Sequence, residues 1–591
     1  MKLKKYIYTA LICTAGALTA TSCNDWLQEE PKSFIGPDQL GDSKEAVDEW
    51  INGVYSNWLY DMFCWGEFPR VLELDADYIS GPSWLLGKLG AGNFQGEESL
   101  QKMWAGPYNL INDANVAERY IRQMTSVDEG YKNNAIGELL FQKAFCYFLL
   151  VRAYGPIPYM STDVANGEDA YGGRVPVAEI YDHIIQMLTE AAQLMYNRDN
   201  ANYQPGHVSA GSAAGLLAKV YATMASAAMP AGTQVTVRTG APYENVTYQG
   251  ESVQIYRAPT AETFNKQTVA GYENMDAQDL YAKAAEWAKK VIDGQYGPYE
   301  LSEYSNLWKR SNRDASEFMW AIQSLDGDTK YRTQIHSFYS GYSTTANPNF
   351  LQSGGWVGCT NNWYSLFDDQ DYRITQGVRH FWRYYYQEEY NGCFYYPQSW
   401  SEKVQGVTQM GEWVEQAEEY KATGLSYQYN QSSECLAFTT KYDDVLNKST
   451  DYADSQWAFL RYADVMLIYA EAENELGNDA EAVNYLNKVR QRSNATLMSA
   501  SPGKTALRSA IIEERAKEFA CEGDRRWDLI RWGIYLDAMN AIVVNKGTPE
   551  ENHQDDAGNS KFRTERNLLY PIPEKEMVAN PNITENNPGW N

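Results

Sequence analysis

Repeated helical spacing of apolar residues constrains the fold of this chain more than any other feature. Segments with this spacing are rich in Ala, Leu and Tyr, and small residues recur where helices must approach closely, as in residues 209–218. Residues 471–486 fit a helix, a Gly-Asn-Asp turn and a second helix, which is a tetratricopeptide-like unit. The pattern predicts a mainly α-helical protein of antiparallel helix pairs, with helices over residues 44–60, 103–123, 134–153, 177–196, 208–225, 279–293, 459–476, 479–492, 504–521 and 525–540.

Two long stretches interrupt this pattern, residues 226–278 and residues 324–458. Both are rich in Gly, Tyr, Trp, Asn, Ser and Thr, which predicts loops with short strands. Loops of this length are uncommon in a compact domain unless they carry a function. We therefore expect a binding site in these insertions and a scaffold in the flanking helices.

The first residues have the pattern of an export signal. Three lysines precede an apolar run from about Ile7 to Leu18, and small residues lead to Cys23. Residues 1–22 are predicted to be a lipoprotein signal peptide, Cys23 the lipidated residue, and residues 23–43 a tether. The run is shorter than the ~20 residues that span a bilayer, so lipid on Cys23 is expected to anchor the chain. The alternative is cleavage by the ordinary signal peptidase, with Cys23 as a bystander.

The chain is strongly acidic. Its formal net charge is −27, and removal of residues 1–22 would take away three lysines and no acid, leaving −30. Nucleic acid is a poor partner for such a surface. Anionic lipid headgroups would also repel it, so membrane association is expected to come from the lipid alone.

Sequence motifs of catalysis are missing. There is no H-E-x-x-H, G-x-S-x-G or P-loop pattern, and the five histidines are dispersed. A glycosidase needs only two carboxylates, and Asp75 and Asp77 are candidates. The same pair suits a solvated loop or a calcium site equally well. We predict a protein that is not an enzyme and has no cofactor, with bound calcium left open.

Aromatic residues give the positive signal for binding. The chain has 18 Trp and 45 Tyr, and residues 381–400 are especially dense in them. Flat aromatic faces pack against the apolar face of a sugar ring while polar neighbours bind its hydroxyl groups. For any single aromatic residue, burial in a small core is the favoured interpretation. The hypothesis of a glycan-binding platform therefore concerns the cluster as a whole.

The cysteines show no C-x-x-C pair, which excludes zinc-ribbon and thioredoxin motifs. Cys146 and Cys521 lie in apolar helical patterns and are predicted to be core residues. Cys359, Cys393 and Cys435 lie in the aromatic loop regions, where a disulfide is compatible with an exported protein. The sequence alone does not pair them.

Several motifs along the chain are similar to those of one family. In chain order they are Cys23–Leu27 with Pro31, Gly137–Phe141 continuing to Tyr154–Pro158, Arg461–Val465, Glu513–Phe519, Glu522–Gly533, Leu569–Pro573 and Asn586–Trp590. With these motifs the chain resembles the SusD/RagB-type outer-membrane lipoproteins of Bacteroidota over nearly its whole length. The Arg-, Glu- and Asp-rich helices among the motifs are predicted to be structural, with their charges paired in a semi-buried network.

The resemblance implies a superhelix of four tetratricopeptide-like helix pairs that supports a variable ligand-binding half. Residues 44–591 would form one SusD-like domain. It would consist of a helical scaffold, mainly residues 44–225, 279–323 and 459–540, a variable insert at about 324–458, and a C-terminal strap at 541–591.

The resemblance also implies a partner and a ligand. Such proteins sit as a lid on a SusC-type TonB-dependent transporter and deliver oligosaccharides, or in some branches peptides. The implied ligand-binding regions hold Asp75, Asp77 and Trp84 after the first helix, and Tyr342, Trp356 and Trp363 in the insert. The rival hypothesis is a structural lid without glycan affinity. Exposure of Trp84, Trp356 and Trp363 on one face would favour the binder, and their burial would favour the lid.

Overall fold

The computed structural model describes most of the chain, with gaps near the N-terminus, in the insert and before the C-terminal strap. The described residues are 40–63, 67–81, 83–167, 171–241, 243–248, 251–326, 331–343, 350–354, 356–384, 393–397, 428–429, 436–450, 452–543 and 562–590. Cys23 and the predicted signal peptide lie outside them.

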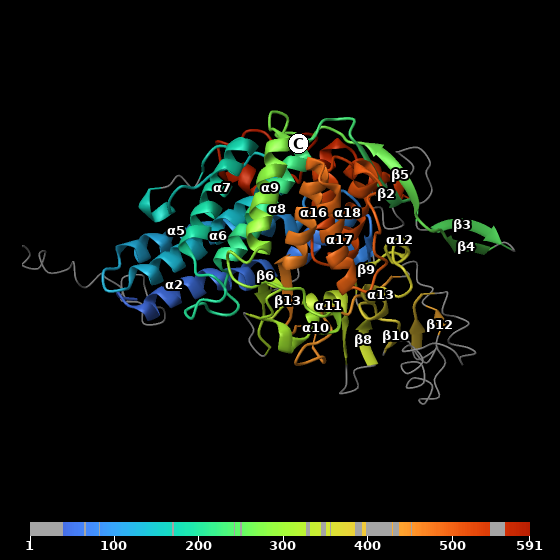
Figure 1. Ribbon diagram of the computed structural model, residues 1–591, viewed down its shortest axis with the longest axis horizontal. Coiled ribbons are helices and arrows are strands. Elements are labelled where there is room, and N and C mark those ends of the chain that lie inside the picture. Colours follow the sequence, from blue (N-terminus) through green and yellow to red (C-terminus); the bar gives the residue numbers. More distant parts are fainter. Residues whose placement is uncertain are drawn as a thin grey trace, which may run out of the picture.

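Long helices packed side by side form the scaffold (Figure 1). Each helix contacts the next in the order α5, α6, α7, α8, α9, α16, α17 and α18. Helices α9 and α16 are neighbours although residues 293–461 separate them, so the insert leaves and re-enters the stack between them. The helical, tetratricopeptide-like prediction is confirmed. The bounds are α5 Glu98–Gln123, α6 Glu129–Tyr154, α7 Val177–Leu194, α8 Ala210–Ala228, α9 Ala277–Ile292, α16 Tyr462–Leu476, α17 Asp479–Arg492 and α18 Lys504–Glu518.

Local sequence signals set several helix ends. The Asp128 carboxylate accepts a hydrogen bond from the Tyr131 N–H at the start of α6. Ser209 and Ser212 form a capping box at the start of α8. Gly477 ends α16 with a φ of +90°, a conformation that glycine adopts without steric cost. These caps satisfy backbone groups that have no partner inside the helix.

Helix α6 is almost completely interior. In the described part of the chain it alone is long and apolar enough to cross a membrane by length and composition, and 94% of its apolar window is buried within the fold. It packs against α5 and α7. Its apolar character is therefore accounted for by its place in the core.

Two predicted helices differ from the structure. Residues 456–461 form strand β13 (Gln456–Arg461), which pairs antiparallel with β6 (Phe318–Gln323), and all six residues of β13 are buried. An apolar run buried on both faces does not distinguish a strand from a helix. The helix expected at 525–540 is two helices, α19 (Arg525–Arg531) and α20 (Tyr535–Ala541). Gly533 separates them with a φ of +62°.

The first long interruption, residues 226–278, contains two β-ribbons. Strand β2 (Gln234–Thr239) pairs antiparallel with β5 (Thr260–Asn265), and β3 (Tyr243–Tyr248) pairs with β4 (Glu251–Tyr256). The second ribbon projects from the body beyond the first (Figure 1). The predicted loop with short strands is thus more regular than expected.

The second interruption, residues 324–458, contains the predicted short strands and also short helices that were not predicted. Its largest sheet has the strand order β12-β11-β10-β8-β7, and it lies at one end of the molecule, below the scaffold in Figure 1. Further elements connect it to the scaffold. The bounds are α11 Ile335–Tyr339, β7 Gly341–Ser343, β8 Phe350–Gly354, β9 Gly358–Cys359, α12 Asn361–Tyr364, α13 Tyr372–Thr375, β10 Phe381–Tyr384, β11 Cys393–Tyr395 and β12 Gln428–Tyr429.

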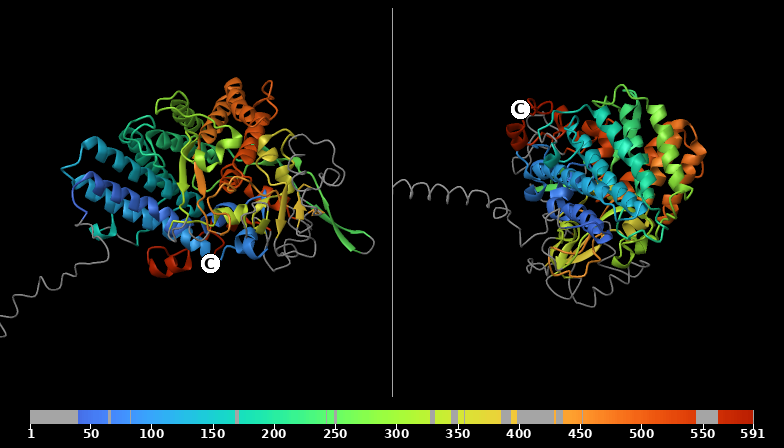
Figure 2. Two further views of the ribbon diagram at one scale, coloured as in Figure 1. Left: turned by 90° about the horizontal axis from the view of Figure 1, so that it is seen from below. Right: turned by 90° about the vertical axis from the view of Figure 1, so that its left-hand side faces the viewer.

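The remaining elements come mostly from the two ends of the chain, and Figure 2 shows the C-terminal segment against the N-terminal helices. Tyr570 exemplifies this contact, because its N–H donates to Ala153 O and its hydroxyl donates to Val71 O. The elements are α2 Lys44–Asn57, the π-helix η2 Trp58–Phe63, α3 Glu67–Glu73, β1 Ile79–Ser80, α4 Ser83–Gly90, η3 Val164–Asn166, α10 Tyr304–Leu307, η4 Arg310–Asn312, η7 Glu565–Leu568 and α21 Glu574–Ala579.

Candidate functional site

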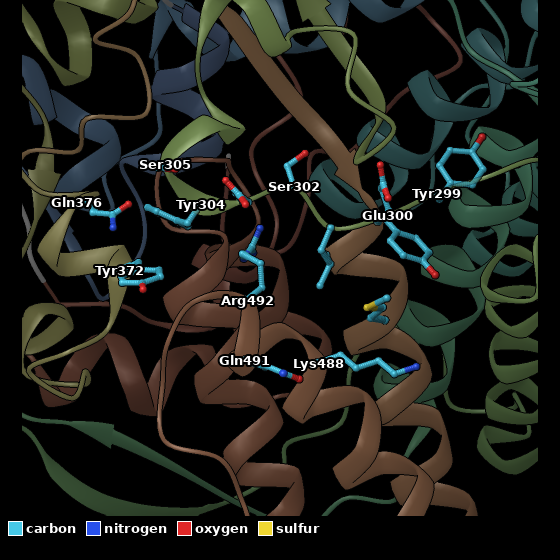
Figure 3. Close-up of a pocket in the computed structure, with 14 residues that line it drawn as sticks. Tyr299, Glu300, Ser302, Tyr304, Ser305, Tyr372, Gln376, Lys488, Gln491 and Arg492 are labelled. Atoms are coloured by element: carbon cyan, nitrogen blue, oxygen red, sulfur yellow. The ribbon is translucent and has the colours of Figure 1, made fainter.

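A cleft lies where the insert meets the scaffold, and three segments form its walls (Figure 3). One wall is the insert helix α13 with the residue that follows it, and it contributes Tyr372 and Gln376. The second is the chain between α9 and α10, and the third is the end of α17 with the facing side of α16. The cleft has a volume of about 760 Å³, and its lining residues are Tyr299, Glu300, Leu301, Ser302, Glu303, Tyr304, Ser305, Tyr372, Gln376, Tyr462, Met466, Lys488, Gln491 and Arg492.

Tyrosine rings lie at the two ends of this cleft, and polar side chains lie between them. Tyr372 and Gln376 lie at one end, Tyr299 at the other, and Lys488, Gln491 and Arg492 between them (Figure 3). Tyr299 and Tyr372 are half-buried, and Gln491 is exposed. The cleft therefore offers tyrosine rings together with hydrogen-bonding groups of several kinds.

Tyr299 is held in one orientation. Its hydroxyl is 2.7 Å from the Ser209 hydroxyl, and its ring stacks on Tyr462 with centroids 6.1 Å apart. The ring also crosses α8 so closely that a Cβ at Gly211 would collide with it. Burial raises the pKa of Tyr299 to about 12, so the phenol stays protonated at neutral pH. A ring fixed in this way loses little entropy when a ligand packs against it.

A buried charge network beneath the cleft centres on Arg461. Its guanidinium contacts Glu317 (2.6 Å), Glu518 (2.9 Å) and Glu522 (2.8 Å), and Arg461 is only 1% exposed. The predicted charge pairing in the Arg- and Glu-rich helices is thus confirmed, and the pairs of Arg461 are buried. We define the charge network as Arg373, Arg461, Arg490, Arg492, Lys441, Glu317, Asp371, Glu514, Glu518 and Glu522.

Each wall of the cleft is attached to this network. The Ser302 N–H donates to Glu317 Oε2 at 2.6 Å. Arg373, the residue after Tyr372, binds Glu514 at 2.6 Å. Arg492 at the end of α17 binds Glu317 and Glu518. The network therefore fixes the relative positions of the three walls.

A backbone contact strengthens the attachment of α13. The Tyr372 N–H donates to Ser493 O at 2.9 Å, which joins the insert directly to the end of α17. Gly377 follows α13 so close to Tyr304 that a Cβ there would collide with the Tyr304 hydroxyl. The insert wall is thus tightly packed against the scaffold.

Asp75 and Asp77 lie in the interior, away from any ligand-accessible surface. Both are 1% exposed. Asp75 binds Arg526 and Arg563 and accepts a hydrogen bond from the Tyr535 hydroxyl, and Asp77 binds Arg525 at 2.7 Å. Their predicted exposure to a ligand is wrong, because arginines from the C-terminal part of the chain already occupy the carboxylate oxygens. They are structural ion pairs between distant parts of the chain.

Trp363 is also an interior residue. It is 5% exposed, and its indole N–H donates to Ala516 O at 2.9 Å. Its predicted place on an exposed platform is therefore wrong. Trp356 is half-buried and packs against the apolar core. Trp84 lies in α4 and Tyr342 in β7, but their side chains are outside the described part of the structure.

The dense aromatic segment at residues 381–400 is only partly described. Strands β10 and β11 pair antiparallel there, with Trp382 opposite Phe394. Their side chains are not described, but Tyr396 is buried and meets Tyr364 edge-on with centroids 5.2 Å apart. Tyr396 thus belongs to the main apolar core, and the platform predicted from the cluster stays a prediction.

Few sequence signals point to the cleft residues. Lys488 and Gln491 stand on the polar face of an ordinary amphipathic helix, and Tyr372 is one of many tyrosines in the insert. The segment 295–305 (QYGPYELSEYS) offered a signal, since it is aromatic and polar and separates two helices. No group of three or more His, Cys, Asp or Glu side chains suited to a metal ion occurs within the described ranges.

Comparison with known proteins decides the family. A model of the "SusD family" matches residues 316–590, and a second model, "Starch-binding associating with outer membrane", matches residues 25–222. The chain belongs to the SusD family. Proteins of this family are binding proteins, and the family is associated with glycan binding and the outer membrane.

Relatives of this SusD-family protein match it over the whole chain or over a part of it. A SusD-like protein of Formosa agariphila is 23% identical over 95% of both chains. Starch-binding protein SusD of Bacteroides thetaiotaomicron is 30% identical, but over only 23% of this chain and 22% of its own.

Solved structures share the fold. A SusD homolog from Bacteroides thetaiotaomicron aligns with a TM-score of 0.67 at 22% identity, covering 93% of this chain and 97% of its own. Surface glycan-binding protein A from Bacteroides fluxus aligns with a TM-score of 0.60 at 18% identity, covering 93% of this chain and all of its own. The predicted SusD-like fold and family are thus confirmed.

Proposed function

We propose that this protein captures an oligosaccharide at the cell surface and delivers it to a SusC-type TonB-dependent transporter. Lipid on Cys23 holds it to the outer membrane. The ligand binds in the cleft, where tyrosine rings pack against sugar rings and the side chains of Lys488, Gln491 and Gln376 bind hydroxyl groups. The protein acts without catalysis.

The combination of tyrosines and polar groups in one cleft carries this proposal. Its two tyrosine-bearing ends, with polar residues between them, suit an elongated ligand of several rings (Figure 3). The cleft is open, so it covers only part of such a ligand. Binding of one chain should be modest, with a Kd near micromolar, which corresponds to roughly −8 kcal/mol.

A binding screen tests this proposal. Residues 24–591, free of lipid, are titrated by calorimetry against plant, host and microbial polysaccharides and their oligosaccharides, with peptides as the alternative ligand class. We expect saturable binding to at least one glycan, and weaker binding in Tyr372→Ala. Saturable binding to peptides alone would replace the glycan by a peptide ligand.

A structural lid is the second candidate. Burial of Trp363 favours it, since a lid without glycan affinity has no need of an exposed tryptophan platform. Its signature would be a folded protein that copurifies with its transporter but binds no member of the panel. Copurification with glycan binding supports the first candidate.

A further inference from the structure

Two buried thiols meet where the insert joins the C-terminal helices. The sulfur atoms of Cys359 and Cys521 are 3.8 Å apart, although 162 residues separate them in the chain. Cys359 is 1% exposed and Cys521 is fully buried. Cys146, the other free cysteine in the described part of the chain, is buried in α6. The pair of thiols was not apparent from the sequence, which placed Cys521 in a helical core and Cys359 in a loop.

The backbone holds both cysteines in place. Cys359 ends β9 and exchanges two backbone hydrogen bonds with Ala437, at 3.0 and 2.8 Å. Cys521 follows α18, and its carbonyl accepts a hydrogen bond from the Tyr442 hydroxyl at 2.6 Å. Cys521 also has a φ of +62°, a conformation that few residues other than glycine adopt. The sulfur contact thus joins two well-fixed segments.

We propose that Cys359 and Cys521 form a disulfide bond in the exported protein. The sulfur atoms are already in van der Waals contact, and the bond requires them to approach to about 2.05 Å. The inference rests on the export predicted from residues 1–22, since disulfides persist in the oxidising cell envelope. It does not depend on the identity of the ligand.

The bond forms by thiol–disulfide exchange with a disulfide-bearing oxidoreductase of the cell envelope. One cysteine thiolate attacks the oxidoreductase disulfide and releases one of its thiols. The second cysteine then attacks the mixed disulfide, which forms the Cys359–Cys521 bond and releases the other thiol. The protein loses two electrons and two protons, and the oxidoreductase disulfide gains them as two thiols.

Exchange takes place during folding, before the cysteines are enclosed. In the folded protein, hydrogen bonding to Cys359 and burial raise the pKa of the Cys521 thiol, so little reactive thiolate is present. The same burial protects the finished bond from reductants. The disulfide is therefore structural and is not a reversible switch.

The bond would tie the cleft wall to the scaffold. Residues 360–377 lead from Cys359 through α12 to Tyr372 and Gln376, and Cys521 follows the helix that carries Glu514 and Glu518. A covalent link here adds to the ion pairs of Arg373 in holding α13. Because it closes a loop of 162 residues, it should restrict the unfolded chain strongly.

Peptide mapping of the full exported lipoprotein tests the proposal. Free thiols are blocked with N-ethylmaleimide in denaturant, and the chain is digested with trypsin without reductant. Lysine and arginine positions place Cys64, Cys146, Cys359, Cys393, Cys435 and Cys521 on separate tryptic peptides. We expect one linked species, residues 333–373 joined to residues 518–525, that separates on reduction, while Cys146 carries maleimide. Maleimide on both Cys359 and Cys521, or linkage of either to another cysteine, would overturn the proposal.

Thermal unfolding provides a second measurement. Cys359→Ser and Cys521→Ser are each expected to lower the Tm by about 3–5 °C. Reductant added during unfolding should lower the Tm of the wild type and of the control Cys146→Ser, but not of the two variants. Equal sensitivity to reductant in all four proteins would contradict the bond. If a serine variant does not fold, peptide mapping of the wild type still decides.

Discussion

The charge network and the cleft contain the same kinds of side chain, but they differ in what satisfies the polar groups. In the network, Arg461 is buried and three carboxylates surround its guanidinium. In the cleft, Gln491 is exposed to solvent and Lys488 is half-buried. The network is complete without a ligand, whereas the cleft has hydrogen-bonding capacity left for one.

Residue type alone therefore does not distinguish a structural role from a binding role. Asp75 and Asp77 were predicted to be ligand contacts, because the family resemblance implies a ligand-binding region after the first helix. In the structure, arginines occupy both carboxylates. The two regions are also connected, since Arg373 and Arg492 attach cleft walls to the network. We therefore expect damage to the network to lower stability, and damage to the cleft to lower affinity alone.

The largest effect is expected from Arg461→Met. This change leaves Glu317, Glu518 and Glu522 buried without their central partner, and losing one member of a buried ion pair costs about 3–5 kcal/mol. The free energy of unfolding, measured with urea and circular dichroism, should fall by about that amount.

An exposed ion pair provides the matched control for Arg461→Met. Lys283 and Asp279 are 2.7 Å apart, with side chains 45% and 56% exposed. Lys283→Met should change the free energy of unfolding by less than about 0.5 kcal/mol. If both methionine variants lower the free energy of unfolding by an equally small amount, the buried network does not stabilise the fold.

Trp363→Ala should lower stability while leaving affinity unchanged. Removing this buried ring should cost about 3 kcal/mol, because a cavity forms and Ala516 O loses its hydrogen-bond donor. Calorimetry at a temperature where the variant is folded should give the wild-type Kd for the glycan. Loss of binding in a folded variant would restore Trp363 to the binding site.

Glu73→Gln should change how stability depends on pH. Burial raises the pKa of Glu73 from its ordinary 4.5 to about 8, so the carboxyl group stays protonated in the folded protein at neutral pH. The stabilisation that Glu73 contributes is complete below pH 4.5 and is lost as the pH rises toward 8, by roughly 3–4 kcal/mol between pH 5 and pH 8. Glutamine cannot ionise, so the variant should lose less stability over this range.

The difference between the Tm profiles of the wild type and of Glu73→Gln isolates the effect of Glu73 from that of other titrating groups. Although burial lowers the pKa of His207, its hydrogen bond to Glu138 raises the pKa overall. His207 therefore also loses its contribution as the pH rises, equally in both proteins. Identical Tm profiles from pH 5 to pH 8 would show that Glu73 does not titrate in this range.

Helical periodicity predicted most of the scaffold, because long amphipathic helices have a strong local signal. It failed at Gln456–Arg461, where an apolar run is buried on both faces as a strand, and at Gly533, where a positive φ divides a helix. The ion pairs of Asp75 join residues more than 400 positions apart. Such contacts depend on the tertiary fold, and local spacing carries no information about them.

The site was predicted at the level of region and not of residue. The insert does form one wall of the cleft, through Tyr372 and Gln376, as the long loop suggested. Trp84, Trp356 and Trp363 were predicted to bind the ligand. Large aromatic rings are also the best core residues, and Trp363 is one of them. Lys488 and Gln491 come together with Tyr372 only because α17 ends beside α13.

A calorimetric titration of Tyr372→Ala tests the central claim most directly, with Tyr60→Ala as its matched control. Tyr60 is 60% exposed on η2, which does not line the cleft. With the glycan identified in the screen, removal of the Tyr372 ring should raise the Kd roughly tenfold, about 1.4 kcal/mol, at an unchanged Tm. Tyr60→Ala should bind like the wild type. Equal affinities for all three proteins would contradict the cleft as the place where this SusD-family protein binds its ligand.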